Sequence, residues 1–248
     1  MVQAQTKTTS AKAEVAIKKE APLPAMLDLE SASGQGSEYV TARDTKLPIL
    51  KILYANSKVL DESDGKYIET AKQGDIYNET TGNLYKGKEG VIVVPCLYIN
   101  TFNEWKDRGD SPGRPVGIHT DPSVMSQTKR GDDFKDRLPN GNYILTVGQH
   151  FVIILDSNGT TETALISMSS SQGKISRKWN AMMMQITLEG KNGLYTPPSF
   201  SHIYKLNTVL NSGKGNQWYG YNITKVGPVN DPAMYERAKQ FYQSLASK

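Results

Sequence analysis

Residues 91–99 read VIVVPCLYI and carry the strongest strand signal in the chain. The run is almost wholly apolar and rich in β-branched residues, which is typical of a strand buried on both faces. Pro95 lacks the N–H group that a sheet ladder requires. We therefore expect a bulge at Pro95, or a strand that changes its partner there.

On either side of this run, short β-branched or aromatic segments alternate with turns rich in Gly, Asn and Asp, which predicts many strands. The runs after the first one cover residues 142–147, 150–156, 162–168, 201–210 and 218–226. Residues 47–54 (LPILKILY) fit either a short helix or an edge strand. Helices are expected at residues 173–184 and about 230–246. The pattern predicts a mostly β, β-rich α+β domain, built as a barrel or open sandwich with a C-terminal helix.

The chain divides into a tail and one domain. Residues 1–40 contain few large apolar side chains and cannot bury enough surface to offset the entropy of ordering them, so we expect a disordered N-terminal tail. Residues 41–248 are expected to form a single β-rich domain. Residues 107–141 hold many Gly, Pro and charged residues, which indicates a functional loop or a disordered insert.

Motifs of cofactor-dependent enzymes are missing. The chain has no GxxxxGK[ST], GxGxxG or GxSxG sequence, a single cysteine and three widely spaced histidines. Cys96 lies in an apolar run and is interpreted as a buried hydrophobic residue, and His150 as a structural histidine. We expect no enzyme, no cofactor and no metal. No apolar run is long enough for a membrane helix and no secretory signal is evident, so a soluble intracellular protein is expected.

One fragment leaves a catalytic alternative open. Glu189-Gly190-Lys191 follows a possible strand and matches the second half of a Mg²⁺-dependent nuclease signature, with Asp156 as the upstream carboxylate. Glu-Gly-Lys is also an ordinary turn after a strand.

Charge and aromatic residues indicate a polyanion ligand. The 248-residue chain carries a net charge of +4, and residues 172–215 hold six basic residues against one acidic residue, Glu189. Thirteen tyrosines outnumber five phenylalanines, and several aromatics adjoin a lysine. Proteins that bind single-stranded nucleic acid place cations along its phosphates and stack aromatic side chains on its bases. A solvated surface that keeps the protein soluble is the simpler alternative.

Four segments together resemble a family of tailed-phage single-stranded DNA-binding proteins: LPILKILYANSK, YIETAKQGDIYNETTGNLY, VIVVPCLYINTFNEW and SSSQGKISRKWNAMM. The resemblance covers residues 45–225 and implies an OB-like Greek-key barrel that grips single strands across one face. It also implies phage DNA replication or recombination as the process and the host cytoplasm as the location. Such binders commonly end in an acidic tail that recruits replication partners, whereas this chain ends YERAKQFYQSLASK.

The first hypothesis is a non-enzymatic single-stranded DNA-binding protein without sequence specificity. Phage or host replication proteins are possible partners, as is a second copy of the chain, and no membrane is involved. The alternative is a structural or host-takeover interaction protein, and a less favoured one is the nuclease. The expected DNA contacts are Lys174, Arg177, Lys178, Trp179, Tyr204 and Lys205, with Phe102, Trp105, Lys106 and Arg108 as a second region.

Overall fold

A computed structural model describes residues 31–32, 35–41, 44–110, 112–156, 161–213 and 215–246. The chain forms two units, Met1–Thr45 and Lys46–Lys248. The described residues of the first unit make turns only. Most of the predicted tail, residues 1–30, lies outside the described residues, so that expectation stays a prediction.

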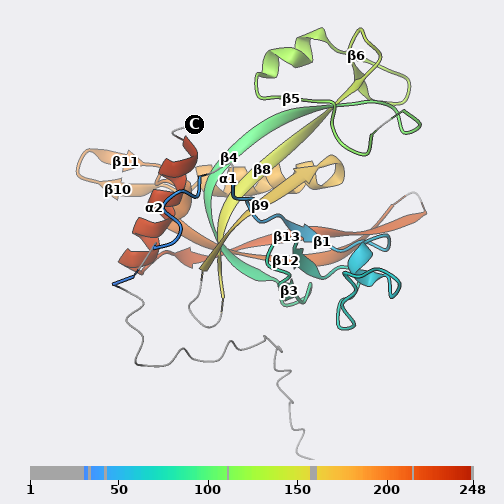
Figure 1. The fold of residues 1–248 in the computed structure, drawn as a ribbon. Helices are drawn as coiled ribbons and strands as arrows, with labels where there is room; N and C mark the ends of the chain where they lie inside the picture. Colours follow the sequence, from blue (N-terminus) through green and yellow to red (C-terminus); the bar gives the residue numbers. More distant parts are fainter. Residues whose placement is uncertain are drawn as a thin grey trace, which may run out of the picture. The chain divides into compact units, whose positions relative to one another are not determined.

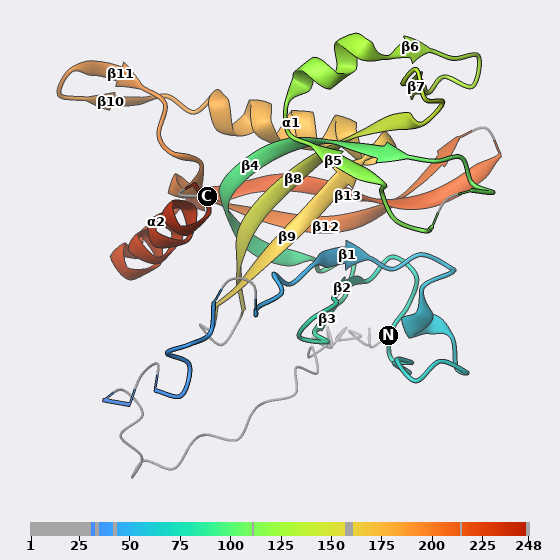
Figure 2. The ribbon, with the colours of Figure 1, turned by 45° about the horizontal axis from the view of Figure 1, so that its top comes forward.

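Five long strands form the main sheet of the second unit: β4 (Val91–Trp105), β8 (Tyr143–Leu155), β9 (Thr161–Ser169), β12 (His202–Gly213) and β13 (Asn216–Pro228). They pair antiparallel in the order β13-β12-β4-β8-β9. Figures 1 and 2 show that the sheet is strongly curled, as a half-barrel. The mostly β prediction is confirmed. The signals at residues 142–147 and 150–156 belong to one continuous strand.

The expected irregularity at Pro95 is present as a register shift between Pro95 and Leu97 in the β4–β8 pairing. It changes which side chains face the inside of the curl. Val93 lies in the inner core before the shift, and Tyr98 contacts the inner residue His150 after it. Because 93 and 98 differ by an odd number, only an extra residue allows both to share a face.

A small sheet lies beside the open edge of the large one. It consists of β1 (Leu50–Ile52), β2 (Ile76–Asn78) and β3 (Leu84–Tyr85), and the 3-10 helix η1 (Lys58–Leu60) follows β1. A parallel bridge links Ile49 to Leu165 of β9, and the Tyr221 hydroxyl of β13 donates to the Leu50 carbonyl oxygen at 3.4 Å. The segment that fitted a short helix or an edge strand is therefore a short strand, which contacts both β9 and β13.

Helix α1 (Gly173–Met184) matches its predicted bounds and packs on the inner face of the sheet. It follows the 3-10 helix η3 (Ser170–Gln172). Its Trp179 is fully buried with Ile154, Ile166 and Leu206 in the largest core cluster. Helix α2 (Pro232–Ala246) covers the other face, where Met234 and Ala238 pack on Cys96 and on the 3-10 helix η4 (Ser199–Ser201). The predicted terminal helix and the burial of Cys96 are confirmed, and no described helix is long and apolar enough to cross a membrane.

The predicted long loop is partly ordered into short elements. These are β5 (Gly117–His119), the 3-10 helix η2 (Pro122–Gln127), β6 (Lys129–Arg130) and β7 (Asp136–Arg137). They pack at the ends of β4 and β8 around a small core of Phe102, Val124 and Ile144. Strands of two or three residues leave no periodic signal in the sequence, so the pattern could not reveal them. A further hairpin, β10 (Leu188–Gly190) and β11 (Gly193–Tyr195), follows α1 (Figure 1).

Gly148 lets α1 approach β8 closely. A Cβ atom at this position would lie 2.4 Å from Ser176 Oγ and 3.1 Å from the Tyr98 ring. Ser176 Oγ is 2.8 Å from His150 Nε2 and shares a hydrogen bond with it in the core.

We predict that Gly148→Ala lowers the free energy of unfolding by about 1–3 kcal/mol, because the methyl group overpacks the contact and displaces the Ser176 hydroxyl. Urea denaturation followed by circular dichroism measures this. Gly173→Ala is the matched control, since Gly173 has helical φ and ψ angles of −58° and −30° and its Cβ would meet only Arg177 Nη1 at 3.7 Å. Equal stability of Gly148→Ala and wild type would contradict the close approach.

Burial lowers the pKa of His150 from 6.5 to about 3. Below pH 6.5 the imidazole of His150 therefore binds a proton in the unfolded chain but stays neutral in the folded chain. The stability that the neutral imidazole contributes is complete above pH 6.5 and is lost as the pH falls toward 3. We predict that stability falls with decreasing pH below this value, by at most roughly 1.4 kcal/mol per pH unit from His150. Urea midpoints between about pH 5 and pH 7 measure the slope.

His150→Gln should flatten that slope because its amide does not titrate. Burial also lowers the pKa of His202, which acts in the same direction, so the difference between wild type and His150→Gln isolates the share of His150. An unchanged slope in His150→Gln would show that this imidazole is not buried in its neutral form.

Candidate functional site

Three predicted contact residues lie on the exposed side of α1. Lys174, Arg177 and Lys178 are all exposed, and their spacing of three and four residues puts them on one face of the helix. No ion pair involves any of the three within the described part of the chain. This face is therefore a patch of uncompensated positive charge.

The aromatic residues predicted beside them are core residues instead, which corrects that part of the prediction. Trp179 and Tyr204 have no exposed surface, and Phe102 is 6 % exposed. Trp179 stacks on His150 with ring centroids 4.5 Å apart, and Tyr204 meets its edge at 5.8 Å. No ring face remains on which a base could stack. Adjacency in sequence was misleading because neighbouring residues of a helix or strand point in different directions.

The other predicted residues are dispersed. Lys205 follows Tyr204 on β12 and is half-buried. Trp105 is half-buried at the end of β4, and Lys106 and Arg108 are exposed just after it. None of these residues lines the groove described next.

A groove of about 730 Å³ lies between α1 and the β6–β7 hairpin, over β4 and β8. We call it the Phe134 groove. Arg177 is the one predicted site residue that lines it. Its other lining residues include Tyr98 and Asn100 from β4, Tyr143 and Gly148 from β8, Arg130, Phe134, Lys135 and Asp136 from the hairpin, Ser170 from η3 and Ser176 from α1.

Three aromatic side chains border this groove. Phe134, in the turn between β6 and β7, is 78 % exposed, and Tyr98 is 36 % exposed. Tyr143 is half-buried, and the Lys135 ammonium group lies 4.3 Å from the centre of its ring. Single exposed apolar side chains are common on protein surfaces, so Phe134 is of interest because it lies in a groove beside two further aromatic rings.

Backbone strain is concentrated at the same place. Among the described residues, Phe134 (φ 60°) and Ser170 (φ 49°) are the two non-glycine residues in the left-handed region, and both line the Phe134 groove. A bulky residue in this region costs about 1–3 kcal/mol and persists where the surrounding structure enforces it, often at functional sites.

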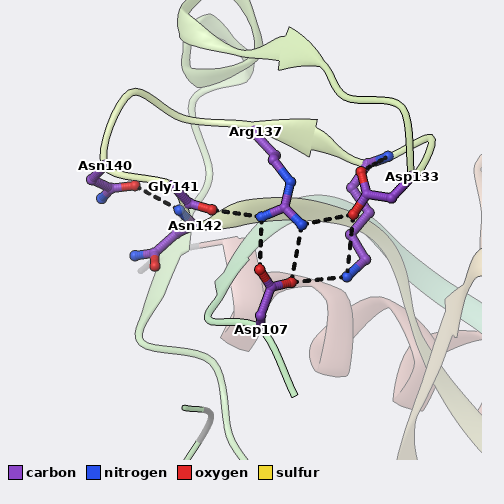
Figure 3. Close-up of polar contacts among 7 residues, drawn as sticks. Asp107, Asp133, Arg137, Asn140, Gly141 and Asn142 are labelled. Carbon is purple, nitrogen blue, oxygen red and sulfur yellow. Dashed lines mark hydrogen bonds and ion pairs between the residues drawn. The ribbon is translucent and has the colours of Figure 1, made fainter. Parts of the chain in front are cut away.

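A network of charges holds the β6–β7 hairpin against the end of β4 (Figure 3). Arg137 donates from both terminal nitrogens to the Asp107 carboxylate, each at 3.0 Å, and from Nη2 to Asp133 at 2.7 Å. It also donates to the Gly141 carbonyl oxygen at 2.7 Å. Lys135 Nζ lies 3.0 Å from Asp107. The hydrogen bonds from Arg137, and then that from Lys135, lower the pKa of Asp107 to about 2.

These ion pairs decide which cations are available for a ligand. Lys135 and Arg137 are held by Asp107 and Asp133, and Arg130 pairs with Asp136 at 2.8 Å. Arg177 remains as the unpaired cation at the groove among the described residues, continuous with Lys174 and Lys178 on α1.

Two carboxylates outside this groove differ in their surroundings. Glu104 accepts hydrogen bonds from the side-chain amides of Asn140 and Asn142 and lies 3.0 Å from His119 Nε2, and these amide hydrogen bonds lower its pKa. Glu189 is exposed on β10. The described residues contain no group of three His, Cys, Asp or Glu side chains placed to hold a metal ion. Nuclease activity stays an untested prediction.

Neither Phe134 nor Tyr98 is among the contact residues that the sequence predicts. The available signal was the length of the 107–141 segment, which indicated a functional loop but not which side chain it presents. Tyr98 was hidden inside the strongest strand signal, because the register shift at Pro95 decides the face on which it lies.

Comparison with known proteins extends the phage resemblance. Residues 17–248 match the model of the Pam3 phage gp34-like protein family. No curated protein and no solved structure matches the chain. The expectation of a phage family is confirmed, whereas its single-strand binding part stays a prediction. Because the match spans nearly the whole sequence, the chain belongs to the Pam3 phage gp34-like protein family.

Proposed function

We propose that this protein binds single-stranded DNA without sequence specificity in phage replication or recombination, in the host cytoplasm, and that it is not an enzyme. The DNA would lie in the Phe134 groove and along the basic face of α1. The observation that carries the proposal is the exposed, strained Phe134 opposite the unpaired Arg177 in one groove.

The strand order supports an OB-type barrel. Three strands follow one another in the sheet (β4, β8, β9), α1 comes next in sequence, and the β12–β13 hairpin then returns so that β12 pairs with β4. A five-stranded Greek-key barrel of the OB type binds oligonucleotides on its second and third strands, between the loop joining strands one and two and the loop joining strands four and five. The Phe134 groove uses the second strand, β8, and the loop between β4 and β8.

The groove also offers the two chemical features that a single strand requires. Tyr98 and Phe134 are both partly or largely exposed at the groove, and bases of any sequence can stack on exposed aromatic rings. Lys174, Arg177 and Lys178 present cations to phosphates, and the counterions that these phosphates release make such binding salt-dependent. Duplex DNA keeps its bases stacked internally and would gain only the charge contacts.

One observation favours a second candidate, an interaction protein of the phage particle or of host takeover. The β10–β11 hairpin exposes Leu188, Leu194 and Tyr195 by 40 %, 77 % and 49 %. An isolated two-stranded hairpin is marginally stable in water, so a protein partner would stabilise it.

We predict that labelled oligo-dT binds with an affinity that falls as salt increases and that an unlabelled duplex of equal length competes poorly. Phe134→Ala should weaken binding by about 1–3 kcal/mol through lost stacking. Arg177→Ala should reduce the slope of log K against log salt by roughly 0.7, the value for one phosphate contact on a single strand. Fluorescence anisotropy at several salt concentrations measures both effects.

Tyr195→Ala is the control for Phe134→Ala, because Tyr195 is an exposed aromatic residue outside the groove. No binding of oligo-dT at low salt would reject the proposal, and the interaction protein would then be favoured. Equal competition by duplex and single strand would reject the stacking mechanism.

Arg137 is predicted to position Phe134 without touching DNA. Arg137→Ala should weaken oligo-dT binding and speed hydrogen exchange of residues 129–137, because the bidentate pair with Asp107 is lost. Arg137→Lys should recover little of either, since lysine cannot form that pair. Arg114→Ala removes an exposed cation from the same loop and should leave hydrogen exchange unchanged. Unaltered exchange in Arg137→Ala would show that the charge network does not hold the hairpin.

A further inference from the structure

We propose that the same DNA strand has a second contact site, in a groove of about 590 Å³ formed by residues 51–79. This inference rests on the proposed single-strand binding. We call the site the tyrosine groove. Three tyrosines and three lysines line it: Tyr54, Tyr67, Tyr77, Lys51, Lys58 and Lys66.

The small sheet forms one wall of the tyrosine groove. Lys51 of β1 lies directly opposite Tyr77 of β2 in the antiparallel register, so their side chains share a face. Ile52 and Val59 are each 3 % exposed and give the groove an apolar floor. The Ile68 N–H donates to the Val59 carbonyl oxygen at 3.0 Å and closes the loop around it. The wall and floor are therefore parts of the folded body.

Two tyrosines are held at the rim by tight turns. The Tyr54 N–H donates to Ser57 Oγ at 2.8 Å, and the Ser57 N–H donates back to the Tyr54 carbonyl oxygen at 2.9 Å. The Tyr67 N–H donates to the Asp64 carbonyl oxygen at 2.9 Å. Tyr54 and Tyr67 nevertheless remain 39 % and 37 % exposed. Partly exposed tyrosines on an ordered backbone offer rings on which a base can stack.

The side chains that line the groove carry more cations than carboxylates, whereas residues 51–79 as a whole hold six acidic and four basic residues. The lining of the groove holds three lysines and one carboxylate, Glu79, which pairs with Lys51 at 2.5 Å. Lys58 lies 3.8 Å from Asp64, beyond hydrogen-bonding distance. Lys66 is exposed and makes no ion pair within the described residues. Tyr67 and the unpaired Lys66 thus place an aromatic face and a cation on adjacent residues of the rim.

The two grooves belong to one folded body. Met168 in the Phe134 groove and Ile52 in the tyrosine groove belong to the same core cluster, so the grooves are fixed relative to each other. Both views show the β6–β7 hairpin and the η1 segment toward the side of the sheet away from α2 (Figures 1 and 2). Roughly 4–16 nucleotides cover one OB-type barrel, and the proposal requires a strand at the upper end of this range to run from one groove to the other.

The test compares a short oligo-dT of about 5 nucleotides with a long one of about 16, within the range that one such barrel covers. The wild-type protein should bind the long oligonucleotide at least tenfold more tightly. Tyr67→Ala should lower affinity for the long oligonucleotide by roughly tenfold and leave the short one unaffected, the size expected for one stacked base. Lys66→Glu reverses the charge of an exposed residue at the rim and tests whether this cation contributes to binding. The double variant Lys191→Ala, Tyr195→Ala removes the same two side-chain types from the β10–β11 hairpin and serves as the control.

The outcomes separate the two proposals. Wild-type affinity that does not rise with length, or variants that bind both oligonucleotides as wild type does, would overturn the tyrosine groove and leave binding at the Phe134 groove intact. Loss of the short oligonucleotide in Tyr67→Ala with an unchanged melting temperature would overturn the assignment of two separate contacts. A wild-type protein that binds neither oligonucleotide would overturn both proposals.

Discussion

The packing of α1 against β8 is the contact on which the rest of the domain depends. Gly148 leaves the space that Ser176 occupies, Ser176 shares a hydrogen bond with His150, and His150 stacks on Trp179. This contact buries an indole ring and an imidazole ring inside the curl of the sheet, where strands β8, β9, β12 and β13 surround them. Because the helix fills the inside of the curl, its opposite face is left in water, and that face carries Lys174, Arg177 and Lys178. The packing of α1 against β8 thus forms the core and also leaves the three basic side chains of α1 on the surface.

The proposed binding surface is built on a different kind of support. The β6–β7 hairpin buries little apolar surface, and hydrogen-bonded ion pairs connect it to the end of β4 (Figure 3). Ion pairs exposed to water contribute little to global stability, but the bidentate geometry of an arginine–carboxylate pair fixes the relative orientation of the two side chains. The hairpin can therefore hold Phe134 at an unfavourable backbone angle, while the energy that maintains the barrel resides elsewhere. A rigid body that presents an elaborated loop is a common basis for recognition.

The two grooves share a design in which aromatic rings are exposed beside unpaired cations. In the Phe134 groove the rings come from a strand and a hairpin, and in the tyrosine groove from two turns and a short strand. Neither groove depends on a fixed sequence motif, because stacking and charge require residue types in space and not a spacing along the chain. Membership of the Pam3 phage gp34-like protein family gives the chain a phage context, in which single-stranded DNA arises during replication and recombination.

Local sequence patterns predict the mostly β architecture, the irregular strand at Pro95, both helices and the burial of Cys96. These features depend on local periodicity, turn residues and the chemistry of proline, which act over a few residues. The basic face of α1 was also evident, because helical spacing alone sets it. Which aromatic rings remain exposed follows from the three-dimensional packing and could not be predicted. Trp179 adjoins Lys178 in sequence but faces the core, whereas Phe134 stands in a segment without a periodic signal, between Asp133 and Lys135, which both form ion pairs. Exposure depends on what packs against a side chain from distant parts of the chain, and a single sequence does not contain that information locally.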